Sequence, residues 1–296
     1  MNWIILVITS GAFFGIANIL DNYLTNHHFK RIPTLIFYSS LLNLLFTPLI
    51  LLIQMPTWPP LYSWPILIGL AITNLLFLYP YYRALQLDDT STVVALFSLG
   101  KIFVPIVAFL FLDETLTKTQ YVGFIIIVIA SSLLTIKDIR KMQFNKSYIY
   151  MILCCLAITA EITLYKISYQ YLNWATAFII SGFIATLLVL PILLIKKHRK
   201  DITSNYKKFK QKIHIFITLE LAAFIAMALY TYSLGLAPLT LIETVGSFSV
   251  FFPLFYAILL HRWIPHFKEQ LNLKQIAYKS TIFLIMILAG YLTLKG

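Results

Sequence analysis

Apolar residues along the chain gather in segments of roughly 20 residues, separated by short polar connections. A helix of that length crosses a hydrocarbon core of about 30 Å. The segments are too long and too continuously apolar for membrane β-strands, which alternate over segments of about 10 residues. The pattern therefore predicts an all-α polytopic membrane protein with ten transmembrane helices, over residues 3–24, 33–53, 65–86, 90–111, 118–136, 148–170, 174–195, 213–236, 239–260 and 276–294.

Composition agrees with a chain that lies in the bilayer. Hydrophobic residues make up 60% of it, charged residues 11%, and the mean hydropathy is +0.84. An ordinary soluble domain carries about 25% charged residues, so that class is excluded. Only Met1-Asn2 precedes the first apolar run, without a charged leader or a small-residue cleavage pattern. We therefore expect a retained helix rather than a signal peptide.

The net charge of +12 comes from basic residues that concentrate in alternate connections. They lie after the first, fifth, seventh and ninth predicted spans, as Lys30 and Arg31, then within 137–146, 196–212 and 262–274. By the positive-inside rule these connections are cytoplasmic, which places both termini outside. We interpret the basic loops as topology signals that contact anionic lipids, not as a nucleic-acid surface. The short loops and tails suggest a bacterial inner membrane.

Metal, disulfide and catalytic signals are weak. Cys154 and Cys155 are adjacent in one span and have no other cysteine to pair with. The six histidines include no His-x3-His pair at helical spacing, so we expect neither a metal nor a cofactor. The sequence also has no G-x-S-x-G and no H-E-x-x-H motif, which argues against an intramembrane enzyme.

The second half of the chain repeats the architecture of the first. Aligning Pro105 with Pro253, each near the end of an apolar run, places Lys101 opposite Ser249. Each half would hold five spans, over residues 1–140 and 141–296. An odd number of spans makes the second half enter the membrane from the opposite side, and such inverted repeats are typical of transporters.

Short motifs in the first half resemble a known family. Tyr82-Arg83-Ala84-Leu85 ends the third span, and the run from Pro105 to Glu114 is followed by Leu116, Gln120 and Gly123. These segments resemble the Tyr-x-Ala-Leu and Pro…Leu-Gly-Glu…Leu…Gln…Gly patterns of the EamA-like group in the drug/metabolite transporter superfamily. Asp113 stands where glycine is usual, and in the second half the acidic residue is replaced by Arg262.

This resemblance implies ten helices in two inverted five-helix halves around a central cavity. The first, third, fourth, sixth, eighth and ninth helices would line the cavity, and the fifth and tenth would be peripheral. Family members move amino acids, nucleosides, sugars, cofactors or drugs, often outward and often driven by a gradient. The fold does not select among these substrates.

Ionisable residues inside predicted spans mark the candidate site. Each costs roughly 2.5–3.5 kcal/mol at a helix centre, so it should face a cavity or a partner. Lys101, Glu161, Glu220, Glu243 and Asp21 all lie on helices that the resemblance assigns to the cavity. Lys101 is the leading substrate-binding residue, and the alternative is a static ion pair with Glu161, Glu220 or Glu243.

The other candidate residues surround this lysine. Glu161 and Glu220 are candidates for proton coupling, because a buried carboxyl group can gain and lose a proton during transport; the alternative is an ion-pair role. Glu243 and Ser249 are candidates for substrate binding, and the alternative for Glu243, as for Asp21, is exposure at the membrane interface. Tyr82 and Tyr232 come from tyrosine clusters at matching ends of two spans, and we expect them either in the cavity or in an interfacial belt.

Taken together, the sequence predicts a secondary active transporter, an exporter or exchanger, for a small polar metabolite such as an amino acid. A flippase for a lipid-linked substrate is the alternative, followed by an intramembrane enzyme. The expected partners are the substrate, the lipid bilayer and coupling protons, and the oligomeric state is left open.

Overall fold

All regular structure is helical in the part of the protein that the computed structural model describes, namely residues 2–87, 93, 96–98, 100–135, 146–252, 255–256 and 273–295. The first half contains α1 (Trp3–His27), α2 (Ile32–Phe46), α3 (Trp64–Leu87), α5 (Phe103–Leu112) and α6 (Lys118–Thr135). The second half contains α7 (Lys146–Ser168), α8 (Trp174–Val189), α9 (Lys196–Gln211), α10 (Ile213–Leu234), α11 (Leu239–Gly246) and α13 (Leu273–Lys295). Short 3₁₀ helices are η1 (Thr47–Leu52), η2 (Leu61–Ser63), η4 (Leu190–Leu194) and η5 (Ser247–Val250).

Six helical segments are long and apolar enough to cross a membrane: Trp3–His27, Ile32–Leu52, Leu61–Leu87, Lys146–Ser168, Trp174–Leu194 and Ile213–Leu234. Shorter apolar helices occupy parts of the other four predicted spans. Parts of the fourth and ninth predicted spans, such as residues 90–92 and 257–260, lie outside the described residues. The protein is thus a multi-pass helical membrane protein, and the count of ten crossings stays a prediction.

Local sequence explains where several helices begin and tighten. The side chains of Asn2 and Asn173 cap α1 and α8 by accepting hydrogen bonds from the backbone amides of Ile4 and Thr176. In the second and seventh predicted spans the α-helix passes into a 3₁₀ helix at Pro48 and Pro191. Proline lacks the amide hydrogen that the α-helical ladder needs, which accounts for the change in both halves.

The end of α5 adopts an unusual backbone conformation. Asp113 follows the helix with a φ of 52°, in the left-handed region. Helices commonly end with a glycine in this conformation, because a side chain costs energy there. This is the position at which the family pattern has glycine, so its backbone conformation explains that preference.

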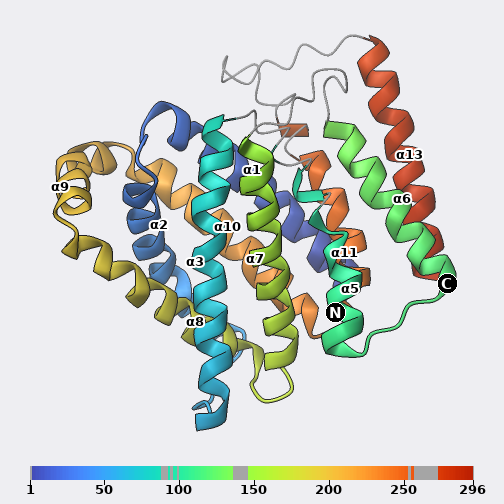
Figure 1. Ribbon diagram of the computed structural model, residues 1–296, viewed down its shortest axis with the longest axis horizontal. Coiled ribbons are helices and arrows are strands. Elements are labelled where there is room, and N and C mark those ends of the chain that lie inside the picture. The colour runs from blue at the N-terminus through green and yellow to red at the C-terminus, as the bar shows by residue number, and fades with distance from the viewer. Residues whose placement is uncertain are drawn as a thin grey trace.

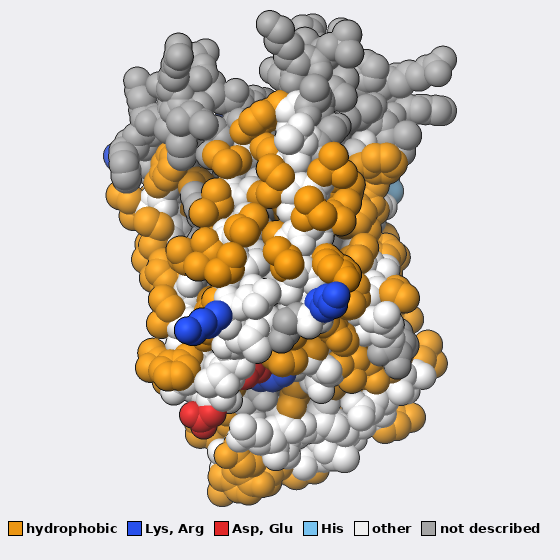
Figure 2. Space-filling view, turned by 90° about the vertical axis from the view of Figure 1, so that its right-hand side faces the viewer, with side chains coloured by type: hydrophobic (Ala, Val, Ile, Leu, Met, Phe, Trp, Pro, Cys, Tyr) orange, Lys and Arg blue, Asp and Glu red, His pale blue; other side chains and the backbone are white. Residues whose placement is uncertain are grey.

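The helices are arranged in a broad bundle (Figure 1). α1, α3, α7 and α10 lie in the middle, α2, α8 and α9 lie at one edge, and α6 and α13 pair at the other. Gly123 permits close packing of this last pair, because a Cβ atom there would lie 2.2 Å from Oγ1 of Thr293 on α13. Figure 2 faces that edge and shows a largely hydrophobic surface, as expected for contact with lipid tails.

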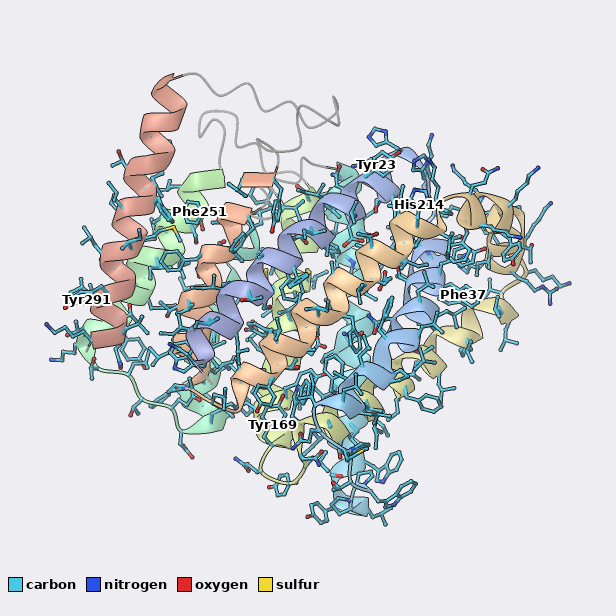
Figure 3. All side chains as sticks on the ribbon, turned by 180° about the vertical axis from the view of Figure 1, so that it is seen from behind. Tyr23, Phe37, Tyr169, His214, Phe251 and Tyr291 are labelled. Carbon is cyan, nitrogen blue, oxygen red and sulfur yellow. The ribbon has the colours of Figure 1, made fainter. Side chains whose placement is uncertain are left out.

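Aromatic side chains project from both ends of the bundle and from its outer helices, as the full set of side chains shows (Figure 3). At the end that carries Tyr169, the rings of Trp58 and Trp64 lie 6.5 Å apart, and those of Tyr62 and Tyr171 lie 5.6 Å apart. Such rings suit the interface between headgroups and hydrocarbon.

One helix was not predicted. Residues 196–212 read as a charged loop, but Lys196–Gln211 form α9. The helix is amphipathic: Ile202 is buried, and the ring of Phe209 stacks on Tyr38 of α2 at 4.0 Å. Ile202, Tyr206 and Phe209 recur at helical spacings of four and three residues. The many lysines around them lower the mean hydropathy, so the segment does not read as an apolar helix.

Candidate substrate-binding cavity

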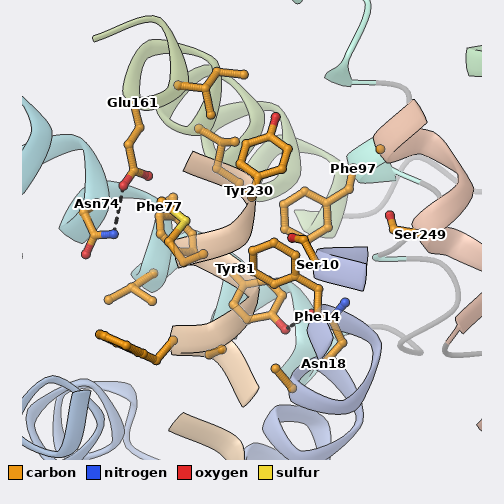
Figure 4. A pocket seen from close by; sticks show the side chains of 18 of the residues that line it. Ser10, Phe14, Asn18, Asn74, Phe77, Tyr81, Phe97, Glu161, Tyr230 and Ser249 are labelled. Atoms are coloured by element: carbon orange, nitrogen blue, oxygen red, sulfur yellow. Dashed lines mark hydrogen bonds between the residues drawn. The ribbon is translucent and has the colours of Figure 1, made fainter. Parts of the chain in front are cut away.

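A cavity of about 360 Å³ lies inside the bundle (Figure 4). It is lined from both halves of the chain, by α1, α2, α3 and Lys101 on one side and by α7, α8, α10, α11 and η5 on the other. Among the described residues, neither α6 nor α13 contributes to the lining. The charged lining residues in the described part of the chain are Asp21, Lys101, Glu161, Glu220 and Glu243.

Lys101 and Glu243 form an ion pair across the two halves. The Nζ atom of Lys101 lies 3.0 Å from Oε2 of Glu243 and 3.3 Å from the backbone oxygen of the same residue. The side chains are 18% and 7% exposed, so the pair is largely withdrawn from water but still reaches the cavity. Gly246 leaves room for the lysine, because a Cβ atom there would stand 3.2 Å from Nζ.

The carboxylates of Glu161 and Glu220 are 2% and 6% exposed at the residue level and both line the cavity. Oε1 of Glu161 accepts a hydrogen bond from the Asn74 side-chain amide at 3.0 Å, which joins α7 to α3 (Figure 4). Asn74 is a neutral partner, and within the described part of the chain neither Glu161 nor Glu220 forms an ion pair with Lys101. Of the three carboxylates expected as partners of Lys101, the one that pairs with it is Glu243.

A third polar cluster surrounds Asp21. Its two carboxylate oxygens accept hydrogen bonds from the hydroxyl groups of Tyr82 at 3.0 Å and Tyr81 at 3.2 Å. The Tyr81 hydroxyl also lies 3.0 Å from Oδ1 of Asn18 on α1. Asp21 is one of the intramembrane charges that mark the candidate site, but its sequence context predicted no binding or coupling role for it. Asn18 and Phe14 precede Asp21 at helical spacing and also line the cavity, so this pattern on one helix face could have indicated that Asp21 belongs to the site.

Aromatic rings complete the lining, including Phe77, Tyr81 and Tyr82 of α3 and Tyr230 of α10. Tyr82, predicted as a cavity residue, is 3% exposed and lies there. Tyr232 does not line this cavity: its ring packs against Trp174 at 5.1 Å, edge to face. The cavity tyrosine of α10 is Tyr230, because residues two apart on a helix point to different faces.

The predicted residues therefore come together in large part. Lys101, Tyr82, Glu243, Ser249, Glu161 and Glu220 all line the cavity, and Tyr232 lies outside it. Their roles in binding or coupling stay predictions.

A second interhelical contact, here called the outer latch, lies where α5, α7, α10 and α11 end or begin. Its residues are Glu114 and Lys166, with Leu234, Ala237 and Leu239 contributing backbone atoms. Nζ of Lys166 lies 3.4 Å from Oε1 of Glu114 and donates to the carbonyl oxygens of Leu234, at 2.8 Å, and Ala237. Oε2 of Glu114 accepts from the Leu239 amide at 2.7 Å. The latch joins the loop after α5 to three elements of the second half.

The fold and cavity define a class: a polytopic α-helical membrane protein with a charged internal cavity, the arrangement expected of a transporter. Residues 1–136 match the model of the EamA-like transporter family. The resemblance found in the sequence is thereby confirmed for residues 1–136, which are similar to the EamA-like transporter family of the drug/metabolite transporter superfamily.

Two further comparisons give a sequence relative and a solved structure. The chain is 32% identical over 114 residues to Protein LicB from Haemophilus influenzae. That match spans 37% of this chain and 39% of the relative, well under two thirds of the relative's length. A solved structure described as "Crystal structure of protein" superposes with a TM-score of 0.61 at 11% identity, over 98% of this chain and 95% of the other. At that identity the likeness concerns the fold alone.

Proposed function

We propose that the protein is a secondary active transporter of a small polar metabolite that carries an amino group, such as an amino acid. The protein would act as an exporter or exchanger in the inner membrane, by alternating access between two inverted five-helix repeats, residues 1–140 and 141–296. The observation that carries the proposal is the cavity lined by both halves, with a cross-half ion pair in its wall.

The charge of the lining favours a substrate with a cationic group. Among the described lining residues four carboxylates accompany one lysine. Since Lys101 and Glu243 neutralise each other, the remaining carboxylates would attract an ammonium group, strongly so in a low-dielectric cavity. The carboxylate of a zwitterionic substrate would compete with Glu243 for Lys101. Opening of the ion pair would thus be part of binding.

Coupling to protons is proposed for Glu161 and Glu220. Both are buried carboxylic acids beside the cavity, and a substrate ammonium group and a proton would compete for the same oxygens. Such competition gives exchange of one substrate molecule for protons. Glu161→Gln and Glu220→Gln should therefore abolish uptake driven by a pH gradient while keeping substrate exchange. Transport by both variants that follows the pH gradient as in the wild type would refute proton coupling through these residues.

The test of the transport proposal uses purified protein in proteoliposomes and a panel of radiolabelled metabolites with and without amino groups. Saturable uptake of an amino-bearing compound is expected, and Lys101→Ala should remove it. Because removing one partner of a buried ion pair costs about 3–5 kcal/mol, the variant must be checked for folding. The double variant Lys101→Met with Glu243→Gln leaves no unpaired charge, so it should fold normally and still fail to transport. Normal transport by that double variant would overturn the proposed role of the pair.

A further inference from the structure

α9 forms a basic platform beside the membrane-spanning helix α2. It carries seven lysine and arginine residues and one acidic residue, Asp201, which pairs with Arg31. The helix is firmly docked: Tyr38 donates a hydrogen bond to the Ile202 carbonyl at 2.7 Å, and Lys208 lies over the ring of Phe29. It follows α8 at an end of the bundle that positive-inside counting assigns to the cytoplasm (Figure 1).

An apolar groove of about 520 Å³ runs beside the contact between α2 and α9 and is lined by both helices. Its size falls within the range of about 300–1,000 Å³ that ligand pockets usually have. The side chains of Leu45 and Tyr206 at its rim are 69% and 59% exposed. The lining residues are Phe37, Tyr38, Leu41, Leu42, Leu45, Ile202, Thr203, Tyr206 and Phe209. In the membrane the α2 side of the groove faces hydrocarbon, because α2 lies in a predicted span.

Cationic side chains stand on the same face of α9 as the groove. Arg199, Thr203, Tyr206 and Lys210 follow one another at helical spacings of four, three and four residues. Arg199 and Lys210 are exposed, and neither forms an ion pair within the described part of the chain. The groove thus opens toward the hydrocarbon and is bordered by two cations that no carboxylate among the described residues neutralises. These features are complementary to a lipid with an anionic headgroup.

We propose that the groove between α2 and α9 binds one anionic glycerophospholipid. One acyl chain lies against Leu41, Leu45 and Tyr206, and the headgroup lies on the face of α9 that carries Arg199 and Lys210, whose positive charges attract its phosphate from either side. Tyr206, which is 59% exposed, lies between these two basic residues along the helix. The bound lipid would fix α9 to α2 at the membrane surface. This site is separate from the central cavity and does not depend on what the cavity carries.

The experiment is native mass spectrometry of the full chain, released from detergent containing phosphatidylglycerol or phosphatidylcholine with the same acyl chains. One retained phosphatidylglycerol is expected, with no comparable retention of phosphatidylcholine. Arg199→Gln with Lys210→Gln should weaken retention roughly 30-fold, since each basic side chain near an anionic surface is worth about 1 kcal/mol. The matched control is Lys197→Gln with Lys200→Gln, which removes the same charge from the opposite face of α9 and should leave retention unchanged.

A second variant tests the groove without changing charge. Thr203→Trp should fill the groove and remove the retained lipid while the protein keeps its thermal stability in detergent. Equal retention of both lipids, or equal loss in the control and in the Arg199/Lys210 variant, would overturn the proposal in favour of diffuse attraction to the basic helix. Retention unaffected by Thr203→Trp would also overturn it, because the acyl chain would then lie elsewhere.

Discussion

At the scale of single residues, the hydroxyl group of Tyr230 is the most direct probe of the cavity. It is buried without a hydrogen-bond partner among the described residues, although its ring lines the cavity (Figure 4). A buried polar group without a partner is costly, so we expect this hydroxyl to gain a hydrogen bond when a bound substrate rearranges the cavity wall. Tyr230→Phe should raise the KM for substrate by about 2- to 10-fold, because one net hydrogen bond contributes roughly 0.5–1.5 kcal/mol.

The control for that variant is Tyr232→Phe, on the same helix. Its ring packs on Trp174 outside the cavity, so the KM should stay at the wild-type value in the same uptake assay. A larger change in KM for Tyr232→Phe than for Tyr230→Phe would contradict the assignment.

Asp113 provides a second test at this scale. Its left-handed backbone (φ 52°) is tolerated by aspartate better than by most residues and disfavours β-branched side chains most. Asp113→Val should therefore destabilise the protein by about 1–2 kcal/mol, whereas Asp113→Gly should be neutral or slightly stabilising. Thermal unfolding in detergent measures both variants. A valine variant as stable as the glycine variant would show that this backbone conformation is not retained.

At the scale of helices, the outer latch ties the end of α5 to the ends of α7 and α10 and to the start of α11. In an alternating-access cycle such a contact closes one end of the cavity and must break when that end opens. Both latch side chains are partly shielded, at 14% and 21% exposure, so their contacts are stronger than those of a free surface pair. Glu114→Gln removes the charge from the ion pair and should favour the outward-open state.

Cysteine labelling measures that shift. In a background with Cys154→Ser and Cys155→Ser, the lining residue Ser181 is changed to cysteine and treated with an impermeant thiol reagent from outside. Glu114→Gln should speed labelling several-fold, while Lys118→Gln, which removes an exposed charge at the nearby start of α6, should not. Identical labelling rates with and without Glu114→Gln would exclude the latch as a gate.

The helices themselves could be predicted from the sequence to different degrees. Long apolar runs identify α1, α3, α7 and α10 to within three residues at each end, because burial in lipid imposes both length and composition. α9 could not be found that way, since its stability comes from a few contacts such as Phe209 on Tyr38 and not from apolar composition. The ion pair of the outer latch was equally hard to predict, because Lys166 and Glu114 lie near the ends of two helices that are far apart in the sequence.

At the scale of the whole molecule, charge distribution determines orientation. The two termini lie in the same part of the bundle, away from the end that carries α9 (Figure 1). The positive-inside rule places that basic end in the cytoplasm and both termini outside. A reporter that is active only in the cytoplasm should therefore be inactive when fused after Gly296 and active when inserted after Lys212. The opposite pattern would reverse the orientation and make the outer latch a cytoplasmic one.

The charged residues of the candidate site could be predicted from the sequence, but the contacts between them could not. Intramembrane charge pointed to Lys101, Glu161, Glu220 and Glu243, since an ionised group in lipid needs a cavity or partner, and all four line one cavity. Which carboxylate pairs with Lys101 depends on the packing of α11 against the segment before α5, and no local pattern encodes it. The same holds for the choice between Tyr230 and Tyr232, which depends on the rotation of α10.

The most direct test of the central claim is a counterflow measurement. Proteoliposomes are preloaded with an excess of unlabelled substrate and diluted into a trace of the labelled compound without any ion gradient. A cavity that faces one side at a time exchanges the two pools, so labelled substrate should rise above its equilibrium level inside and then decline. The Lys101→Met, Glu243→Gln double variant should abolish the rise. A monotonic approach to equilibrium in the wild type, without overshoot, would contradict the carrier mechanism.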